Sequence, residues 1–234
     1  MIKKLFISFL TLLFFTGCDT LTGIQNGTSG GVLTESEAGE GLREALSQGV
    51  TSAILNLNKQ DGFFGNNAYK LFFPPDARKI ERTLRDIGLG SQVDKAILQI
   101  NRAAEDAVGY AKPVFVNAIK QMTIADALNI VRGGDTAATG YFRSKTKDQL
   151  LEAFKPSVQE SLDKLQATRY YSDVVNRYNK IPTTLTKLNP DLTSFVVNKA
   201  TDALFDQIAL EEANIRANPV ARTTDILKRV FGKR

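Results

Sequence analysis

The chain has 234 residues, of which 30 are Lys or Arg and 25 are Asp or Glu, and it contains one Cys and neither His nor Trp. Without histidine, this chain has no Ser-His-Asp or Cys-His catalytic unit and no His metal ligand. Its single cysteine excludes an internal disulfide and a cysteine-rich zinc site. The composition therefore excludes the commonest catalytic and metal sites.

The first 17 residues have the pattern of a signal peptide. Lys3 and Lys4 precede an uncharged run from Leu5 to Phe15. As a helix, this run of about 11 residues is roughly 16 Å long, against about 30 Å for the hydrocarbon core of a bilayer. It is too short to span comfortably and has the size of a signal-peptide hydrophobic region.

The residues that follow sharpen this interpretation. Phe15-Thr16-Gly17-Cys18 resembles the bacterial lipobox, in which a cysteine is lipidated and becomes the new N-terminus, although Phe15 departs from the commoner Leu. We expect residues 1–17 to be a lipoprotein signal peptide and Cys18 to carry acyl chains that hold the protein at a membrane. The alternative is an uncleaved hydrophobic anchor with an incidental cysteine. Asp19 leaves the choice between inner and outer membrane open.

Cleavage before Cys18 would remove two lysines and leave 217 residues with a formal charge of +3, which is weak evidence for any charged partner. Residues 18–33 are rich in Gly, Thr, Ser and Asn, so we expect a lipidated, flexible tether with a span on the order of 20 Å. Residues 34–234 are expected to form one domain. No later stretch is apolar enough to span a membrane.

Order begins with a helix over about 35–58. Thr34 and Glu37 form a capping-box pattern. Apolar residues then recur at three- and four-residue steps on one face: Leu42, Leu46, Val50, Ala53, Ile54 and Leu57.

A loop rich in aromatic residues follows over 59–75, and Phe63, Phe64, Phe72 and Phe73 are its candidate contact residues. A loop this apolar is not expected to lie free in water. We favour an interpretation in which these side chains close one end of a helical bundle. The alternative is an exposed patch that binds a partner or lipid.

Prolines and a capping residue predict where the next helices begin. Pro74-Pro75 opens a helix with Ile80, Leu84 and Ile87 on its buried face. Ser91 is expected to cap the next helix, which Pro113 should kink or restart. The inward residues of that helix are expected to be Val93, Ile97, Ile100, Ala104 and Val108.

The second half of the chain continues in the same way. Thr123 and Asp126 mark another start, Gly133-Gly134 marks a stop, and Asp135 is expected to cap a short helix. A further helix is expected from about Thr146, with a kink or break at Pro156.

Two more helices are expected before the C-terminal segment. The apolar and aromatic spacing predicts a short helix over 170–178, and Asp191 caps a long one that ends at Asn218-Pro219. A last helix should follow Thr223 or Thr224. The predicted fold is all-α: a single helical-bundle-like domain of about seven to nine helices.

Three stretches carry a family resemblance: AKPVFVNAIKQMTIADAL (111–128), GGDTAATGYFRSKT (133–146) and NPVARTTDILKRVFG (218–232). Together they resemble a family of bacterial lipoproteins catalogued as domain of unknown function 4197, over about 33–232. The resemblance implies a helical, lipid-anchored envelope protein. It implies no assigned activity and no catalytic residues.

The candidate catalytic and ligand-binding residues also fit ordinary helix surfaces and helix ends. Glu40 and Glu44, like Asp202 and Asp206, lie one helical turn apart and could bind a cation or divide acid and base roles. A solvated helix face has the same spacing far more often. Residues 133–136 lack the ending of a phosphate-binding loop and fit a helix stop followed by a start. We expect no catalytic residue, metal or cofactor.

The C-terminal residues 216–234 carry a net charge of +5. Lys228, Arg229 and Phe231 belong to a short basic amphipathic helix that could lie on anionic lipid. Packing against the bundle is the favoured alternative. Nucleic acid is a poor partner for an exported protein.

Two functions follow. The first is a lipid-anchored lipoprotein of the bacterial cell envelope, facing the periplasm, with a non-enzymatic binding or structural role. Its expected partners are the membrane, through the anchor, and a protein or lipid of the envelope. The alternative is an envelope hydrolase that uses carboxylates or a Tyr/Lys pair in a cleft between helices.

Overall fold

The computed structural model describes most of the chain from Thr34 onwards. Several predicted features lie outside the described residues. They are the expected signal peptide and tether with Cys18, the last helix with Arg229 and Phe231, most of the expected 170–178 helix, and Ile87. The described residues are 34–86, 88–164, 168, 171–172, 176, 179–180, 187–189, 191–218 and 228.

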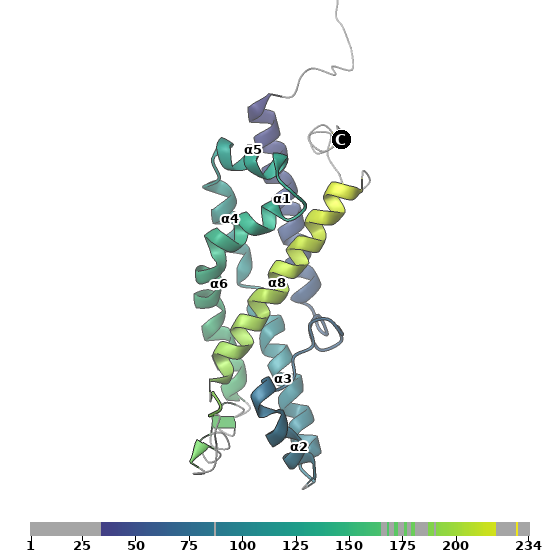
Figure 1. Ribbon diagram of the computed structural model, residues 1–234, viewed down its shortest axis with the longest axis vertical. Helices are drawn as coiled ribbons and strands as arrows, with labels where there is room; N and C mark the ends of the chain where they lie inside the picture. Colours follow the sequence, from purple (N-terminus) through teal and green to yellow (C-terminus); the bar gives the residue numbers. More distant parts are fainter. Residues whose placement is uncertain are drawn as a thin grey trace, which may run out of the picture. The chain divides into compact units, whose positions relative to one another are not determined.

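The fold is all-α, as predicted, and the described residues contain no strand. None of the described helices is long and apolar enough to cross a bilayer. The elements, shown in Figure 1, are α1 (Glu35–Leu57), the 3-10 turn η1 (Pro75–Ala77), α2 (Arg78–Asp86), α3 (Gly90–Val108), α4 (Ala111–Lys120), α5 (Ile124–Arg132), α6 (Ala137–Lys164) and α8 (Leu192–Ala217).

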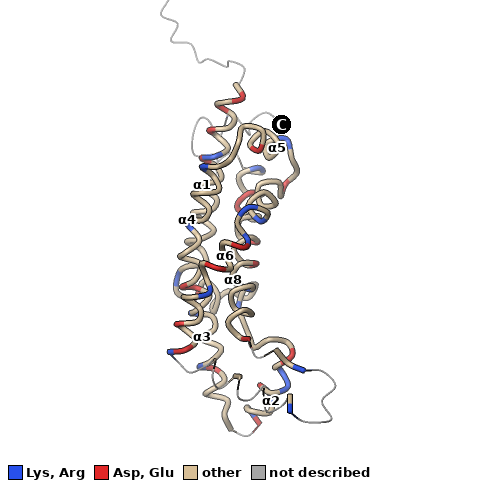
Figure 2. Tube along the Cα trace, turned by 90° about the vertical axis from the view of Figure 1, so that its left-hand side faces the viewer, with Lys and Arg blue, Asp and Glu red and all other residues tan. Residues whose placement is uncertain are grey.

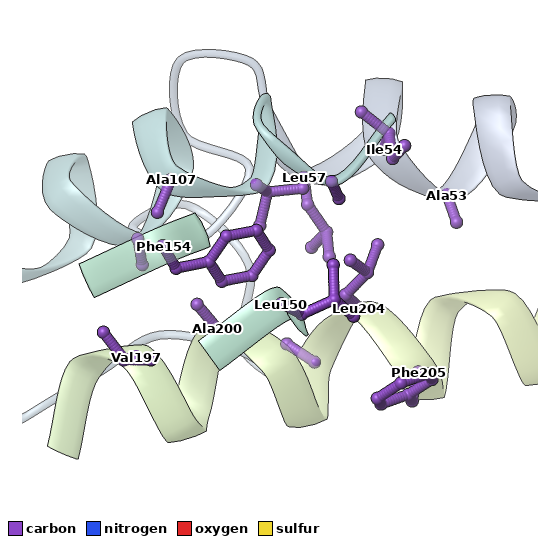
Figure 3. Close-up of a cluster of buried hydrophobic side chains, with 14 of the residues drawn as sticks. Ala53, Ile54, Leu57, Ala107, Leu150, Phe154, Val197, Ala200, Leu204 and Phe205 are labelled. Carbon is purple, nitrogen blue, oxygen red and sulfur yellow. The ribbon is translucent and has the colours of Figure 1, made fainter. Parts of the chain in front are cut away.

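Helix α8 is central to the packing, since it lies against α1, α3 and α6, while α4 and α5 pack on α1 and α6. The core combines side chains from four of these helices. In Figure 3, Leu57 of α1, Ala107 of α3, Phe154 of α6 and Leu204 of α8 meet in one cluster. All four are fully buried. Removing such apolar surface from water is the main stabilising term of the fold.

The predicted helix starts at Thr34, Thr123 and Asp191 are confirmed. The Thr34 and Thr123 hydroxyls each accept a hydrogen bond from the backbone N–H three residues later, and an acidic side chain at that position returns the contact. Asp191 accepts a bond of 2.9 Å from the backbone N–H of Ser194. These side chains satisfy donors that a helix start leaves unpaired.

The predicted restart near Pro113 is also confirmed, because α3 ends at Val108 and Pro113 is the third residue of α4. The first turn of a helix needs no backbone donor, so proline fits there without losing a hydrogen bond. The five residues predicted to face inward from α3 are all buried.

The division of residues 135–164 into two helices was wrong, because α6 is continuous from Ala137 to Lys164 and passes through Pro156 without a break. A stripe of buried residues at four-residue steps, including Phe142, Thr146 and Leu150, spans the expected gap. The Thr146 hydroxyl donates to the carbonyl oxygen of Phe142 at 2.7 Å. Packing of this stripe outweighs the roughly 3 kcal/mol cost of an internal proline, whose ring lies exposed on the opposite side.

Two smaller predictions also differ from the structure. Ser91 does not cap α3, which begins at Gly90, and its hydroxyl instead donates to the Gln92 side chain at 2.8 Å. Helix α2 has no fully buried residue, since Ile80 and Leu84 are only partly buried against the core. Helix α2 is therefore a short outer element.

Candidate functional site

The aromatic loop, residues 59–74, is held against α3 by buried polar side chains. The amide oxygen of Asn101 accepts a hydrogen bond of 2.8 Å from the backbone N–H of Leu71, and its NH2 group donates to the Leu71 carbonyl at 2.8 Å. Asn101 is completely buried. It therefore satisfies both backbone polar groups of one loop residue, as a neighbouring strand would.

Glu105 makes a second attachment one turn further along α3. Its Oε1 accepts hydrogen bonds from the backbone N–H groups of Phe63 and Phe64, at 3.0 and 3.1 Å. Its Oε2 accepts from the Arg102 guanidinium at 2.6 Å, and Arg102 also pairs with Asp61 at 2.8 Å. Hydrogen bonding to Glu105 raises the pKa of Arg102 above its usual value. The buried carboxylate is thus fully used in fixing the loop.

The structure separates the four phenylalanines that the sequence proposed as contacts. Phe63 and Phe73 are buried, with 0% and 9% of their surfaces exposed, and Phe64 is partly buried. Phe72 is 47% exposed. The loop therefore mainly packs on the core, as the favoured interpretation expected, while Phe72 remains available for contact.

An open groove runs between α8 on one side and the aromatic loop with η1 on the other, and we call it the α8 groove. Two adjoining cavities of about 290 and 340 Å³ make it up. Both are lined by Pro75, Phe195, Lys199 and Asp202, so they form one continuous depression. Its size falls within the range of known ligand sites, about 300–1,000 Å³.

Charged and aromatic side chains both line the α8 groove. Lys70 lies over the aromatic rings of the loop, with its Nζ 4.0 Å from the centroid of Phe64 and 5.7 Å from that of Phe72. Asp202 forms a 3.5 Å ion pair with Arg143. The other charged lining residues are Asp76, Arg78, Asp191, Lys199 and Asp206.

Asp191 has a structural duty at one end of this groove. Desolvation disfavours its charged form, yet hydrogen bonds from Ser194 more than compensate and lower the pKa of Asp191 below its usual value. The carboxylate is therefore ionised near neutral pH, which adds a fixed negative charge to that end of the groove.

A second buried acid, Glu212 of α8, holds the start of α6. Its Oε1 accepts from the backbone N–H of Ala138 at 3.0 Å, and its Oε2 accepts from the N–H and hydroxyl of Thr139 at 2.9 and 2.8 Å. Arg216 donates to Glu212 at 2.8 Å and to the carbonyl of Ile130, the end of α5, at 3.0 Å. The neighbouring cavity is only about 30 Å³. This pair joins three helices and leaves no room for a substrate.

The family model described as "Protein of unknown function (DUF4197)" matches residues 32–232 of the chain. The chain belongs to this family. The match agrees with the resemblance carried by its three sequence stretches and covers nearly the whole helical body. No curated protein and no solved structure matches the chain. The description of the DUF4197 family assigns no activity, so the site must be argued from its geometry.

The remaining candidate residues of this DUF4197 chain are on solvated surfaces. Glu40, Glu44, Asp202 and Asp206 are exposed, and no group of three potential metal-ligating side chains occurs within the described ranges. Figure 2 shows acidic and basic residues interspersed along the helices. Lys228 is helical, exposed and has an interaction partner.

Sequence reasoning missed the polar residues that matter most for the architecture of this DUF4197 chain. Asn101 and Glu105 continue the buried face of α3 at four-residue steps from Ile97, and Glu212 lies four residues after the buried Ile208. A polar residue at an apolar position of a helix is the feature that could have identified them, because burial requires such a group to be hydrogen bonded.

Proposed function

We propose that this DUF4197 protein is a lipid-anchored protein of the bacterial cell envelope with a non-enzymatic binding role. The anchor is supported by the sequence of residues 1–18, in which two lysines and a short apolar run precede a lipobox-like cysteine. Two or more acyl chains on Cys18 would suffice for stable membrane attachment.

The contacts made by the buried acids favour a binding role over a catalytic one. Among the described residues only Glu105 and Glu212 are buried acids, and each accepts backbone N–H donors together with an arginine. Acids engaged in this way are structural, because moving a proton would break the contacts that hold the loop or α6. Among the described residues, the α8 groove is an open surface whose lining combines charges with aromatic rings.

The hydrolase alternative keeps one supporting observation. Asp202 and Asp206 lie one turn apart and line the α8 groove beside Lys199, so two carboxylates and an amine share one surface. All three side chains are exposed, whereas acid–base catalysis at neutral pH usually depends on burial to shift pKa values. A hydrolase of this type would lose all activity in both Asp202→Asn and Asp206→Asn, which a screen of purified variants on ester, amide and glycoside substrates would reveal.

The anchor is tested by Cys18→Ser in the full chain expressed in a bacterial host. Radiolabelled palmitate should enter the wild type and not the variant, and the variant should leave the membrane fraction. Thr20→Ser, two residues away, is the matched control and should be labelled normally. A wild type that never incorporates the label, with a variant that stays in the membrane fraction, would rule out the lipid anchor.

A further inference from the structure

We propose that the α8 groove binds an extended peptide in which an apolar side chain is flanked by a basic group on one side and an acidic group on the other. This inference rests on the proposed binding role and not on the lipid anchor.

The shape of the groove indicates an elongated ligand. The lining residues of α8 recur at three- and four-residue steps and therefore form one stripe along a single face. From Asp191 to Asp206 this stripe is roughly 22 Å long at about 1.5 Å per residue. An extended peptide rises about 3.3 Å per residue, so six or seven residues would follow its length.

The opposite wall of the groove is formed by residues 68–76 and by Arg78. Residues 68–73 face the part of the groove that ends at Asp206, and residues 74–76 face the part that begins at Asp191. Loop and helix thus form two sides of an open groove, along which an extended segment can lie.

The charges of the groove are polarised along this direction. Asp76 and Asp191 line only the cavity at one end. Among the described residues that line this cavity, the shared Lys199 is the one cation. Lys70 and Arg78 line only the other cavity, together with Asp206. A basic group is therefore complementary to the first end and an acidic group to the second.

Apolar surface lies beside these charges, since Pro75 and Phe195 line both cavities together with Lys199 and Asp202. Phe72 is 47% exposed and lines the groove together with Pro75 and the partly buried Phe195. The loop bearing Phe72 is fixed from behind by Asn101 and Glu105, so these surfaces are already in place before a ligand arrives. Preorganisation of this kind lowers the entropic cost of binding.

A lipid surface fits these observations less well. The described residues that line the groove include three cations and four acids, whereas binding to anionic lipid uses an excess of cations. The aromatic loop also follows the end of α1, and α1 separates it from Thr34, where the predicted tether joins, by roughly 34 Å.

The test uses the full chain in a mild non-ionic detergent and three end-blocked, fluorescein-labelled heptapeptides. All three carry a central Leu-Phe, and their two outer charged positions are Glu and Lys, Glu and Glu, or Lys and Lys. Fluorescence anisotropy should give the mixed peptide an affinity about fivefold higher than either like-charged peptide, since each exposed ion pair is worth up to about 1 kcal/mol. Raising the salt concentration to 0.5 M should remove the difference.

Asp76→Asn is the informative variant, because Asp76 is exposed and lines the end expected to take the basic group. It should weaken binding of the mixed peptide about threefold and leave the doubly acidic peptide unaffected or bound more tightly. Asp86→Asn, an exposed acid at the end of α2 outside the groove, is the matched control and should change neither affinity.

Three results would overturn the inference: equal affinities for the three peptides, equal effects of the two variants, or no binding below about 1 mM. Displacement of bound peptide by phosphatidylglycerol vesicles, but not by phosphatidylcholine vesicles, would assign the surface to lipid instead. Normal palmitate labelling of Cys18 beside any of these results would remove the peptide ligand alone and leave the anchored protein as proposed.

Discussion

The Glu105 carboxylate on α3 accepts a hydrogen bond of 3.0 Å from the backbone N–H of Phe63, which lies 42 residues earlier in the sequence. This contact fixes the aromatic loop at its beginning, and the Asn101 contacts with Leu71 fix it near its end. The exposed ring of Phe72 is therefore carried by a loop whose backbone is tied to the core at two points. These contacts hold the loop wall of the α8 groove against α3.

Replacing Glu105 should destabilise the protein in two graded steps. Glu105→Gln keeps one acceptor for the loop but turns a neutral group toward Arg102, and we expect a loss of about 1–2 kcal/mol. Glu105→Ala removes the acceptor of the Phe63 and Phe64 N–H groups and leaves Arg102 with Asp61 alone, and we expect a loss of about 3 kcal/mol. Urea denaturation measures both, with the exposed Glu40→Gln as a control within about 0.5 kcal/mol of wild type. An alanine variant as stable as that control would contradict the role assigned to Glu105.

The Glu212–Arg216 pair should behave asymmetrically. Glu212→Ala removes the acceptor at the start of α6 and the carboxylate that pairs with the buried Arg216 guanidinium. We therefore expect a loss of about 3 kcal/mol in the free energy of unfolding. Arg216→Ala leaves Glu212 held by the N–H groups of Ala138 and Thr139, and about half that loss is expected. Native-state hydrogen exchange should show faster exchange at Ala138 and Thr139 in Glu212→Ala only. Equal protection of these amides in both variants would argue against the cap.

Local features of the sequence predicted the helix starts well. Thr34 and Thr123 each bond a residue three positions later, so the whole interaction is contained in the sequence pattern. The break before Pro113 is local in the same sense, since proline acts on its own turn.

Long-range contacts could not be predicted in this way. Asn101 bonds Leu71 at a separation of 30 residues, and Glu212 bonds Ala138 at a separation of 74. The sequence places these polar residues on buried helix faces but contains no indication of their partners. Pro156 was misjudged because the local rule for proline was outweighed by a buried stripe that packs against other helices.

The aromatic loop lies between these two cases. Leu71 and Phe73 are buried while Phe72 between them is exposed, which is the alternation of an extended segment. Hydrophobicity alone does not distinguish Phe72 from Phe73. The distinction comes from the anchoring of Leu71 by Asn101, which sets which side of the segment faces the core.

Gly62 should not tolerate a side chain. A Cβ added there would collide with the backbone carbonyl of Leu57, at the turn where α1 leads into the aromatic loop. Gly62→Ala must shift that turn, and we expect a loss of about 2–3 kcal/mol. Gly134→Ala is the matched control, since a Cβ there meets nothing within 4 Å, and it should be neutral or stabilising by up to about 1 kcal/mol. Thermal unfolding of both variants measures the contrast, and equal melting temperatures would refute it.

Tyr171 should make stability fall at alkaline pH. Burial raises the pKa of Tyr171 to about 12 from a usual value of 10. The hydroxyl donates to the carbonyl of Asn189 at 3.2 Å. The ring packs on that of Phe73, with 6.1 Å between the two ring centroids. Below pH 10 the residue is protonated in both folded and unfolded states, so its contribution is fully present. Between pH 10 and 12 the unfolded state loses its proton first, and up to about 2–3 kcal/mol of stability is lost.

The variant Tyr171→Phe should lower the free energy of unfolding by about 1 kcal/mol at pH 8 but flatten this alkaline loss. The control Tyr110→Phe, at an exposed tyrosine, should leave the dependence of stability on pH unchanged. Urea denaturation from pH 8 to 11.5 compares the three proteins, and parallel profiles for Tyr171→Phe and wild type would disprove the assignment.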